Sequence, residues 1–286
     1  MNVYWVLENS KKLDPFYLSP LELKCMENSI KNWKKFYPDT LTHIYCDETT
    51  KPYLESVDLL KEWHVVNTEV LSKPDDINRT IFWTAAKLKV MNEIKAPFIM
   101  MDIDFLVLTN KLKLGELQYF TFVGTQAESN KMYADPNKMP YSGLIQMFDI
   151  LWNNDHVMNM SFIYVRDENI RKEFTHVSRL WEEILTYSFR HTPHSTAEMT
   201  FVEQSLLTQL CTNTGLRIAS LTNELHESEK PYFNYPQTWN DLGLRYRQDF
   251  HHLGDNKRMA IFDQDVFEQQ KEMLNILGSG IILVLL

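Results

Sequence analysis

The chain has 286 residues, 44% of them hydrophobic, which is enough to bury a large core in one domain. Its formal net charge of −9 argues against nucleic acid as a general partner, because no basic face is available to release counterions from phosphates. The three cysteines form an odd, sparse set without a Cys-x-x-Cys pair. This argues against a disulfide framework or a zinc site and indicates core thiols in a reducing compartment.

Apolar runs and helical periodicity alternate along the chain, and this βαβ rhythm predicts an α/β fold with a mainly parallel central sheet flanked by helices. No internal repeat or interdomain linker interrupts the rhythm, so we expect a single domain over residues 1–286. The predicted strands are residues 3–7, 41–46, 63–67, 96–101, 119–124 and 157–165. The predicted helices are 20–36, a short one after 46, 79–94, 168–187, 201–211 and 263–277. The polar segment 126–142, which contains two prolines, is predicted to be a long surface loop.

Two carboxylates follow the most apolar of these strands. The run from Ala96 to Met101 ends abruptly at Asp102-Ile103-Asp104. Side chains that follow strand ends in an open α/β sheet face the crevice where ligands bind, and paired carboxylate oxygens suit a hard cation such as Mg²⁺ or Mn²⁺. A cation of this kind in a protein site typically binds a phosphate or diphosphate group of the ligand. Acids at strand ends are also common turn formers, and that reading stays open.

A second candidate motif lies near the C-terminus, where His251, Gly254 and Lys257 recur at three-residue intervals. A neutral imidazole can complete a carboxylate metal site, a glycine lets the backbone approach a phosphate, and a lysine supplies a charge for a diphosphate. The spacing suits a short loop wrapped around one polyanion. A solvated turn is the alternative.

Three further segments complete an ordered series with these two motifs. The stretch from Trp83 to Leu88 is a small-residue helix segment that carries Lys87. The stretch from Met158 to Val165 has an asparagine, Asn159, next to small and apolar residues. The stretch from Phe201 to Leu207 opens a predicted helix with Glu203 and Gln204.

In this order, over about residues 80–257, the series resembles the metal-dependent glycosyltransferases with the GT-A fold, particularly the group of glycogenin and the bacterial lipopolysaccharide galactosyltransferases. The resemblance implies a GT-A, Rossmann-like nucleotide-sugar-binding fold, with a nucleotide-binding half at about 1–125 and an acceptor and catalytic half at about 126–286. Lys87 stands where the family usually has arginine, Ser161 replaces a glycine, and Ser205 replaces the third acid of an Asp-Gln-Asp segment.

The resemblance also implies the roles of the motif residues. Asp102, Asp104 and His251 would hold Mn²⁺ or Mg²⁺, with Asp102 also near the donor ribose. The other implied donor contacts are Lys87, Asn159, Gly254 and Lys257. Glu203 and Gln204 would lie beside the reacting sugar carbon. The donor would be a UDP-sugar, because the resembling families mostly use uridine diphosphate, and the acceptor a hydroxyl of a glycan or other glycoconjugate.

Several alternatives stay open at this point. Retention of the anomeric configuration is implied by the resemblance, but Glu203 as a general base would give inversion. Thr200-x-x-Glu203 is also a capping box, which would give Glu203 a structural role. A phosphohydrolase of the haloacid dehalogenase type also uses an Asp-x-Asp pair, and a degenerate, non-catalytic carbohydrate-binding protein would explain the departures from the family pattern.

The two ends of the chain give the expectations about location. The first residues lack a basic segment followed by a long apolar run, so no secretory signal is visible and a cytoplasmic enzyme is expected. The apolar tail 281–286 is far shorter than the roughly 20 residues that span a bilayer, so no transmembrane segment is expected. A weak peripheral association through this tail is the remaining expectation.

Overall fold

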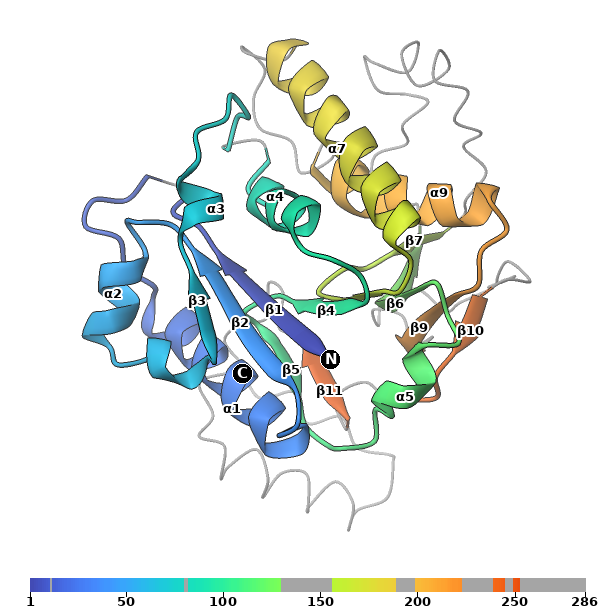
Figure 1. Cartoon of the computed structure of the whole chain (residues 1–286), viewed down its shortest axis with the longest axis horizontal. Helices are drawn as coiled ribbons and strands as arrows, with labels where there is room; N and C mark the ends of the chain where they lie inside the picture. The colour runs from blue at the N-terminus through green and yellow to red at the C-terminus, as the bar shows by residue number, and fades with distance from the viewer. Residues whose placement is uncertain are drawn as a thin grey trace, which may run out of the picture.

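A nine-stranded sheet forms the centre of the molecule in the computed structural model, which describes residues 1–10, 12–79, 82–129, 156–188, 199–222, 239–244 and 249–252. Its strand order is β10-β9-β6-β8-β4-β1-β2-β3, and β7 pairs with β6 beside this path (Figure 1). Five pairings are parallel and three, which involve β7 and β8, are antiparallel. The strands are β1 (Asn2–Leu7), β2 (Leu41–Cys46), β3 (Val65–Asn67), β4 (Phe98–Met101), β6 (Phe122–Ser129), β7 (His156–Met158), β8 (Phe162–Val165), β9 (Ile218–Thr222) and β10 (Trp239–Asp241).

Helices cover both faces of this sheet, as predicted (Figure 1). One apolar core lies between the sheet and α3 (Glu69–Ser72), α4 (Ala85–Glu93), α7 (Glu168–Ser188), the π-helix η4 (Phe201–Ser205) and α9 (Leu206–Asn213). The other core lies on the opposite face, beneath α1 (Pro20–Phe36), α2 (Lys51–Ser56), the short turn η1 (Leu60–Glu62) and α5 (Leu114–Leu117). Because β4 is buried along its whole length between β1 and β8, the residues that follow it emerge at the middle of the sheet edge.

Local signals explain why the N-terminal elements match their prediction closely. Ser19 caps α1 and forms a reciprocal capping box with Glu22, and Pro20 takes the first helical position, where its missing N–H leaves no bond unmade. The parallel pairing of β1 and β2 runs from Asn2 opposite Leu41 to Leu7 opposite Cys46. The two strand ends therefore meet at one edge of the sheet.

The chain beyond β4 differs from the prediction in three places. Strand β6 continues to Ser129, so the predicted loop 126–142 is wrong for its first four residues, and the rest of it lies outside the described residues. The predicted strand 157–165 is divided at Asn159–Ser161 into β7 and β8, which pair with different parts of β6. Strand β9 and the short strand β5 (Phe105–Val107) were not predicted at all.

Strand β5 belongs to a small second sheet, in which it pairs antiparallel with β11 (Phe250–His252). The predicted helix 263–277 and the apolar tail 281–286 lie outside the described residues. Among the helices that the structure does describe, none combines the length and the apolar character required to cross a membrane.

Candidate active site

The acid pair lies in the turn that joins β4 to β5. The backbone N–H of Asp102 donates to the carbonyl of Ser161 at 2.8 Å, which fixes the first acid against the break between β7 and β8. The N–H of Phe105 donates to the carbonyl of Asp102 at 3.1 Å and closes the turn. The Asp102 side chain is 32% exposed, whereas Asp104 is buried. The first acid therefore faces the solvent side of the sheet edge, as expected for a ligand-binding position.

Lys87 on α4 is buried between two carboxylates that lie far from it in sequence. Its Nζ is 2.6 Å from Asp102 Oδ1 and 2.5 Å from Glu203 Oε1, and it also donates to the carbonyl of Met160 at 3.2 Å. Burial opposes the charged form, but the two carboxylates outweigh it and raise the pKa of Lys87 above its usual range. Lys87, Asp102 and Glu203, named below the acid–lysine triad, thus carry one positive and two negative charges.

Glu203 enters this triad from the π-helix η4. Its side chain is only 3% exposed, and burial raises the pKa of its carboxyl, with Asp102 adding to the rise and Lys87 opposing it. Thr200 makes no side-chain capping bond at the start of η4, so the capping-box alternative for Glu203 is not what the structure shows. The wide turn of a π-helix occurs frequently at functional sites, because it aims a side chain that a regular helix would place elsewhere.

Gln204 follows Glu203 in the same turn and presents an unused acceptor. Its side-chain oxygen is buried and has no hydrogen-bond partner among the described residues. A buried amide oxygen without a partner costs folding free energy, on the order of 1–3 kcal/mol. Such an atom beside a charged triad is therefore a candidate for contact with a ligand.

Asn159 lies next to the triad, but its side-chain amide is hydrogen-bonded to other residues of the protein. Its Nδ2 donates to Glu128 Oε1 at 2.9 Å, and its Oδ1 accepts from the N–H of Ser161 at 3.0 Å and from the Ser161 hydroxyl. Glu128 also accepts from Gln126 Nε2 at 3.0 Å. In this arrangement Asn159 orients the segment whose carbonyls hold Lys87 and Asp102, rather than pointing a free amide outward.

The histidine motif approaches the acid turn through its backbone. In the β5–β11 pair, His251 lies opposite Leu106 and His252 opposite Phe105, the residue directly after Asp104. Gly254 and Lys257 lie outside the described residues. Among the side chains that the structure describes, no three His, Cys, Asp or Glu groups gather as a metal site. The side chain of His251 is not among them, so the predicted metal ligands stay a prediction.

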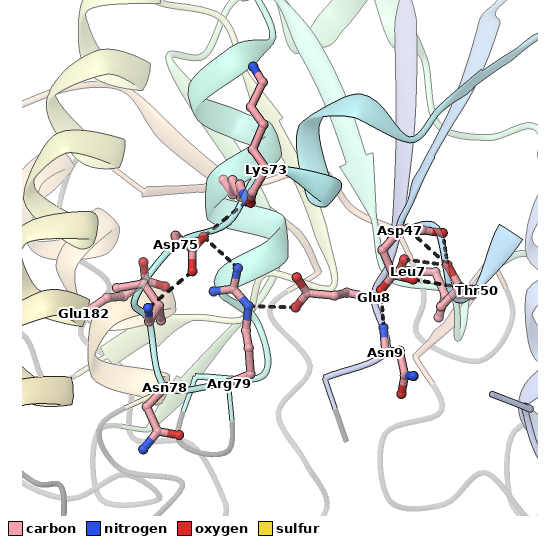
Figure 2. A network of polar contacts seen from close by, with 12 residues as sticks. Leu7, Glu8, Asn9, Asp47, Thr50, Lys73, Asp75, Asn78, Arg79 and Glu182 are labelled. Atoms are coloured by element: carbon pink, nitrogen blue, oxygen red, sulfur yellow. Dashed lines mark hydrogen bonds and ion pairs between the residues drawn. The ribbon is translucent and has the colours of Figure 1, made fainter. Parts of the chain in front are cut away.

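A cavity of about 1140 Å³ lies beyond the carboxyl ends of β1 and β2. Its wall includes Glu8 and Asn9 after β1, Asp47 after β2, and Arg79, whose Nε is 2.8 Å from Glu8 Oε2 (Figure 2). Asp47 Oδ2 accepts from the N–H of Asn9 at 2.6 Å and so joins the two strand ends. The aromatic rings of Phe16, Tyr17 and Tyr53 also line it.

None of the predicted motifs includes this cavity, although the sequence does contain a signal for it. Glu8 and Asp47 each come directly after a parallel strand, as Asp102 does, and the carboxyl ends of neighbouring parallel strands meet at one edge of the sheet. In the register of β1 with β4, Trp5 lies opposite Met101, so Asp102 and Glu8 leave the sheet on the same side. The cavity and the acid–lysine triad therefore share one edge.

Comparison with known proteins places the fold. No protein-family model matches the chain, and no curated protein sequence matches it either. Among solved structures, the chain is similar to the apo form of mouse xyloside xylosyltransferase 1, with 12% identity over 90% of this chain and 99% of the other, at a TM-score of 0.50. An active-site mutant of LgtC matches at 12% identity over 88% and 86% of the two chains, with a TM-score of 0.46. An inositol-1-phosphate CTP transferase from T. maritima matches at 11% identity over 96% of each chain, with a TM-score of 0.40.

At these identities a structural likeness shows the fold and does not show the substrate or the chemistry. The likeness to the xylosyltransferase extends over nearly the whole of both chains. It agrees with the mixed sheet and with the helices on both of its faces. The chain has the GT-A type of α/β fold that its sequence predicts.

Proposed function

We propose that the chain is a glycosyltransferase that moves a sugar from a nucleotide diphosphate donor, with UDP-sugars first among the candidates, to a hydroxyl of a glycan or glycoconjugate. The observation that carries the proposal is the acid–lysine triad. Lys87, Asp102 and Glu203 belong to three separate motifs of the family-like series, and they meet within 2.6 Å at the carboxyl edge of the sheet.

The triad suits a donor that carries a diphosphate. Lys87 is held in its charged form by two carboxylates, and one of them, Asp102, is accessible from outside. An arriving diphosphate would offer Lys87 a third anion, and a positive charge held in a dry site stabilises negative charge that develops on a leaving group. Lys257, predicted as a further contact, would add to this effect from the histidine motif.

The donor atoms at the acid turn fit a hard divalent cation. Carboxylate oxygens of Asp102 and Asp104 are the ligands that Mg²⁺ and Mn²⁺ prefer, and β11 brings the backbone of His251 beside β5. These three residues would hold the cation. When bound, it would neutralise the charge of the diphosphate and stabilise the departing nucleoside diphosphate.

Retention of configuration is the stereochemical outcome that we favour. Glu203 Oε1 is committed to Lys87, which leaves this carboxylate poorly placed to act as a base for an acceptor hydroxyl. The buried, unpaired oxygen of Gln204 offers an acceptor dipole to a sugar carbon that becomes positive. In the alternative, Glu203 leaves Lys87 when the donor binds and deprotonates the acceptor, which gives inversion.

The cavity at Glu8 and Arg79 is the proposed place of the nucleoside. It combines aromatic rings that can stack on a base with carboxylates that can accept from ribose hydroxyls, and it shares a sheet edge with the triad. The nucleotide half would then be formed by about residues 1–125, and the acceptor would enter from the side of about 126–286.

The first experiment is to incubate the protein with a panel of nucleotide sugars, with Mn²⁺ or with a chelator, and to measure release of nucleoside diphosphate. Metal-dependent release from one donor, reduced about 10²-fold or more by Asp104→Asn, supports the proposal. The exposed Asp58→Asn serves as a control, because Asp58 has a positive φ that asparagine tolerates well.

The other outcomes separate the alternatives. Release of inorganic phosphate from sugar phosphates supports the phosphohydrolase reading instead. Binding of a nucleotide sugar without turnover, in the presence of a panel of glycan acceptors, supports a non-catalytic carbohydrate-binding protein. Turnover that is insensitive to the chelator would contradict the metal-dependent mechanism.

A further inference from the structure

A second group of charges, partly exposed except for the buried Glu182, lies outside the triad and reaches the cavity at one end. Arg79 contacts both Glu8, at 2.8 Å, and Asp75, at 2.8 Å. Asp75 Oδ2 is also 3.2 Å from Lys89 Nζ and 3.6 Å from Arg179 Nη2. Arg179 Nη1 in turn lies 2.9 Å from Glu182 Oε2. These six residues, called here the charge relay, are Glu8, Asp75, Arg79, Lys89, Arg179 and Glu182.

The relay connects two parts of the molecule that the sequence separates widely. Glu8 and Arg79 form part of the cavity wall, and Asp75 lies between Arg79 and the helix layer (Figure 2). Lys89 comes from α4, and Arg179 and Glu182 come from α7. A change of charge at one end can therefore reach the other through direct ion pairs.

Glu182 is the group of the charge relay that is most easily protonated near neutral pH. Its side chain has no exposed surface, and its Oε1 has no hydrogen-bond partner among the described residues. Arg79 Nη1 is likewise buried without a partner in this part of the chain. Burial raises the pKa of Glu182 to about 7, in spite of Arg179 and Arg79 nearby. With Glu182 ionised the relay has three charges of each sign, and with Glu182 protonated it carries one net positive charge.

We propose that an anionic nucleotide entering the cavity at Glu8 and Arg79 is bound together with a proton, which Glu182 takes up from solution. The proposal rests on the proposed function in one respect, that the cavity holds the nucleotide of the donor. It adds a coupling between this site and a residue of α7 that touches no ligand.

The direction of the coupling follows from the charges around Glu182. The groups that face it among the described residues are Arg179 from its own helix and Arg79 and Asp75 from the loop before α4, and Asp75 is also paired with Lys89 of α4. A bound anion competes with Glu182 for Arg79 and excludes water from the cavity, and both effects disfavour the carboxylate. By linkage, affinity for the anion must then fall as pH rises through the titration of Glu182.

Calorimetric titration with UDP tests the proposal. Near neutral pH, with Mn²⁺ in excess, the heat of binding is measured in two buffers of different protonation enthalpy, and the difference gives the number of protons taken up. We expect the wild type to take up about 0.2 to 0.4 proton per UDP more than Glu182→Gln does. Glu183→Gln, at the adjacent exposed position of α7, is the matched control and should behave as the wild type.

A second measurement detects the added proton in the wild type itself, and the variant serves only as its control. The infrared difference spectrum of the wild type with and without UDP should gain the band of a protonated carboxyl group in an apolar environment, and the band should be absent from Glu182→Gln. This keeps the proposal testable even if the variant folds poorly.

Each result has a distinct meaning. Proton uptake that is lost only in Glu182→Gln supports the proposal. UDP binding with the same uptake in all three proteins, and without the new carboxyl band, overturns the proposal and leaves the proposed function standing. A complete absence of UDP binding overturns the nucleotide site itself, and the coupling with it.

Discussion

The acid–lysine triad makes a strong prediction about stability, because its lysine is the only charge that balances a deeply buried carboxylate within the described site. Lys87→Met keeps the length and most of the apolar stem of the side chain but removes the ammonium group. Glu203, which is 3% exposed, would then be left without its 2.5 Å partner, and Asp102 would lie nearby as a like charge. We therefore expect a large loss of stability.

The magnitude follows from the burial of the two partners. Removing one member of a buried ion pair costs about 3–5 kcal/mol, because the remaining charge stays desolvated. The contact with Asp102 adds little to this figure, since its side chain is 32% exposed and is screened by solvent. The free energy of unfolding of Lys87→Met, measured by urea titration at neutral pH, should therefore fall by about 3–5 kcal/mol.

A double mutant tests the cause. Glu203→Gln removes the charge that Lys87 balances, so the double mutant Lys87→Met with Glu203→Gln should recover about 1–3 kcal/mol relative to Lys87→Met alone. Lys172→Met on α7 is the control: Lys172 is 64% exposed and 3.8 Å from Glu168, and its loss should cost at most about 1 kcal/mol. If Lys87→Met costs no more than Lys172→Met, or if the double mutant shows no recovery, the triad does not balance buried charge as described.

Two further predictions concern the fold around the site. Burial raises the pKa of Glu182 to about 7, from about 4.5 in the unfolded chain, so its contribution to stability is full below about pH 4.5 and is lost as pH rises through about 7. Relative to the wild type, Glu182→Gln should therefore gain up to about 3 kcal/mol between acidic and mildly alkaline pH, measured by urea unfolding. An equal difference at all pH values would contradict the assignment. A Cβ at Gly124 would overlap the Met158 side chain and lie 3.0 Å from the carbonyl of Asn159, so Gly124→Ala should lower the free energy of unfolding by about 1–3 kcal/mol. Gly115→Ala, with open space around the new Cβ, should not lower it. Equal melting temperatures for the two variants would refute this prediction.

Local sequence signals were sufficient for much of the fold. The boundaries of α1 and β2 follow from a capping box with proline at the first helical position and from an apolar run between turns. Local signals failed for strands whose formation depends on pairing with segments that are distant in the sequence. Strand β9 is a buried run of only five residues, and β5 is a run of three that begins immediately after the acids, so neither has a periodicity of its own.

In the candidate site, too, the residues could be predicted from local motifs but their contacts could not. The motif residues Lys87, Asp102 and Glu203 were predicted as site residues, and the structure brings them together. That Lys87 binds Glu203 depends on how α4 and η4 pack against α7, which no local pattern specifies. The inward orientation of the Asn159 amide depends on Glu128, a buried carboxylate of the strand that was predicted to have become a loop. The metal ligands and the histidine motif stay predictions.

The pairing of β5 with β11 has a consequence for the order in which the protein matures during synthesis. Strands β1 to β4 and their helices come from the first 101 residues and can associate while the rest of the chain is still being translated. The strand that follows the acid turn finds its partner only when residues 250–252 have left the ribosome. At a synthesis rate of about 5–20 residues per second, the acid turn therefore waits on the order of ten seconds or more for this support. A nascent chain would therefore pair β1 to β4 early and complete the support of the candidate site late.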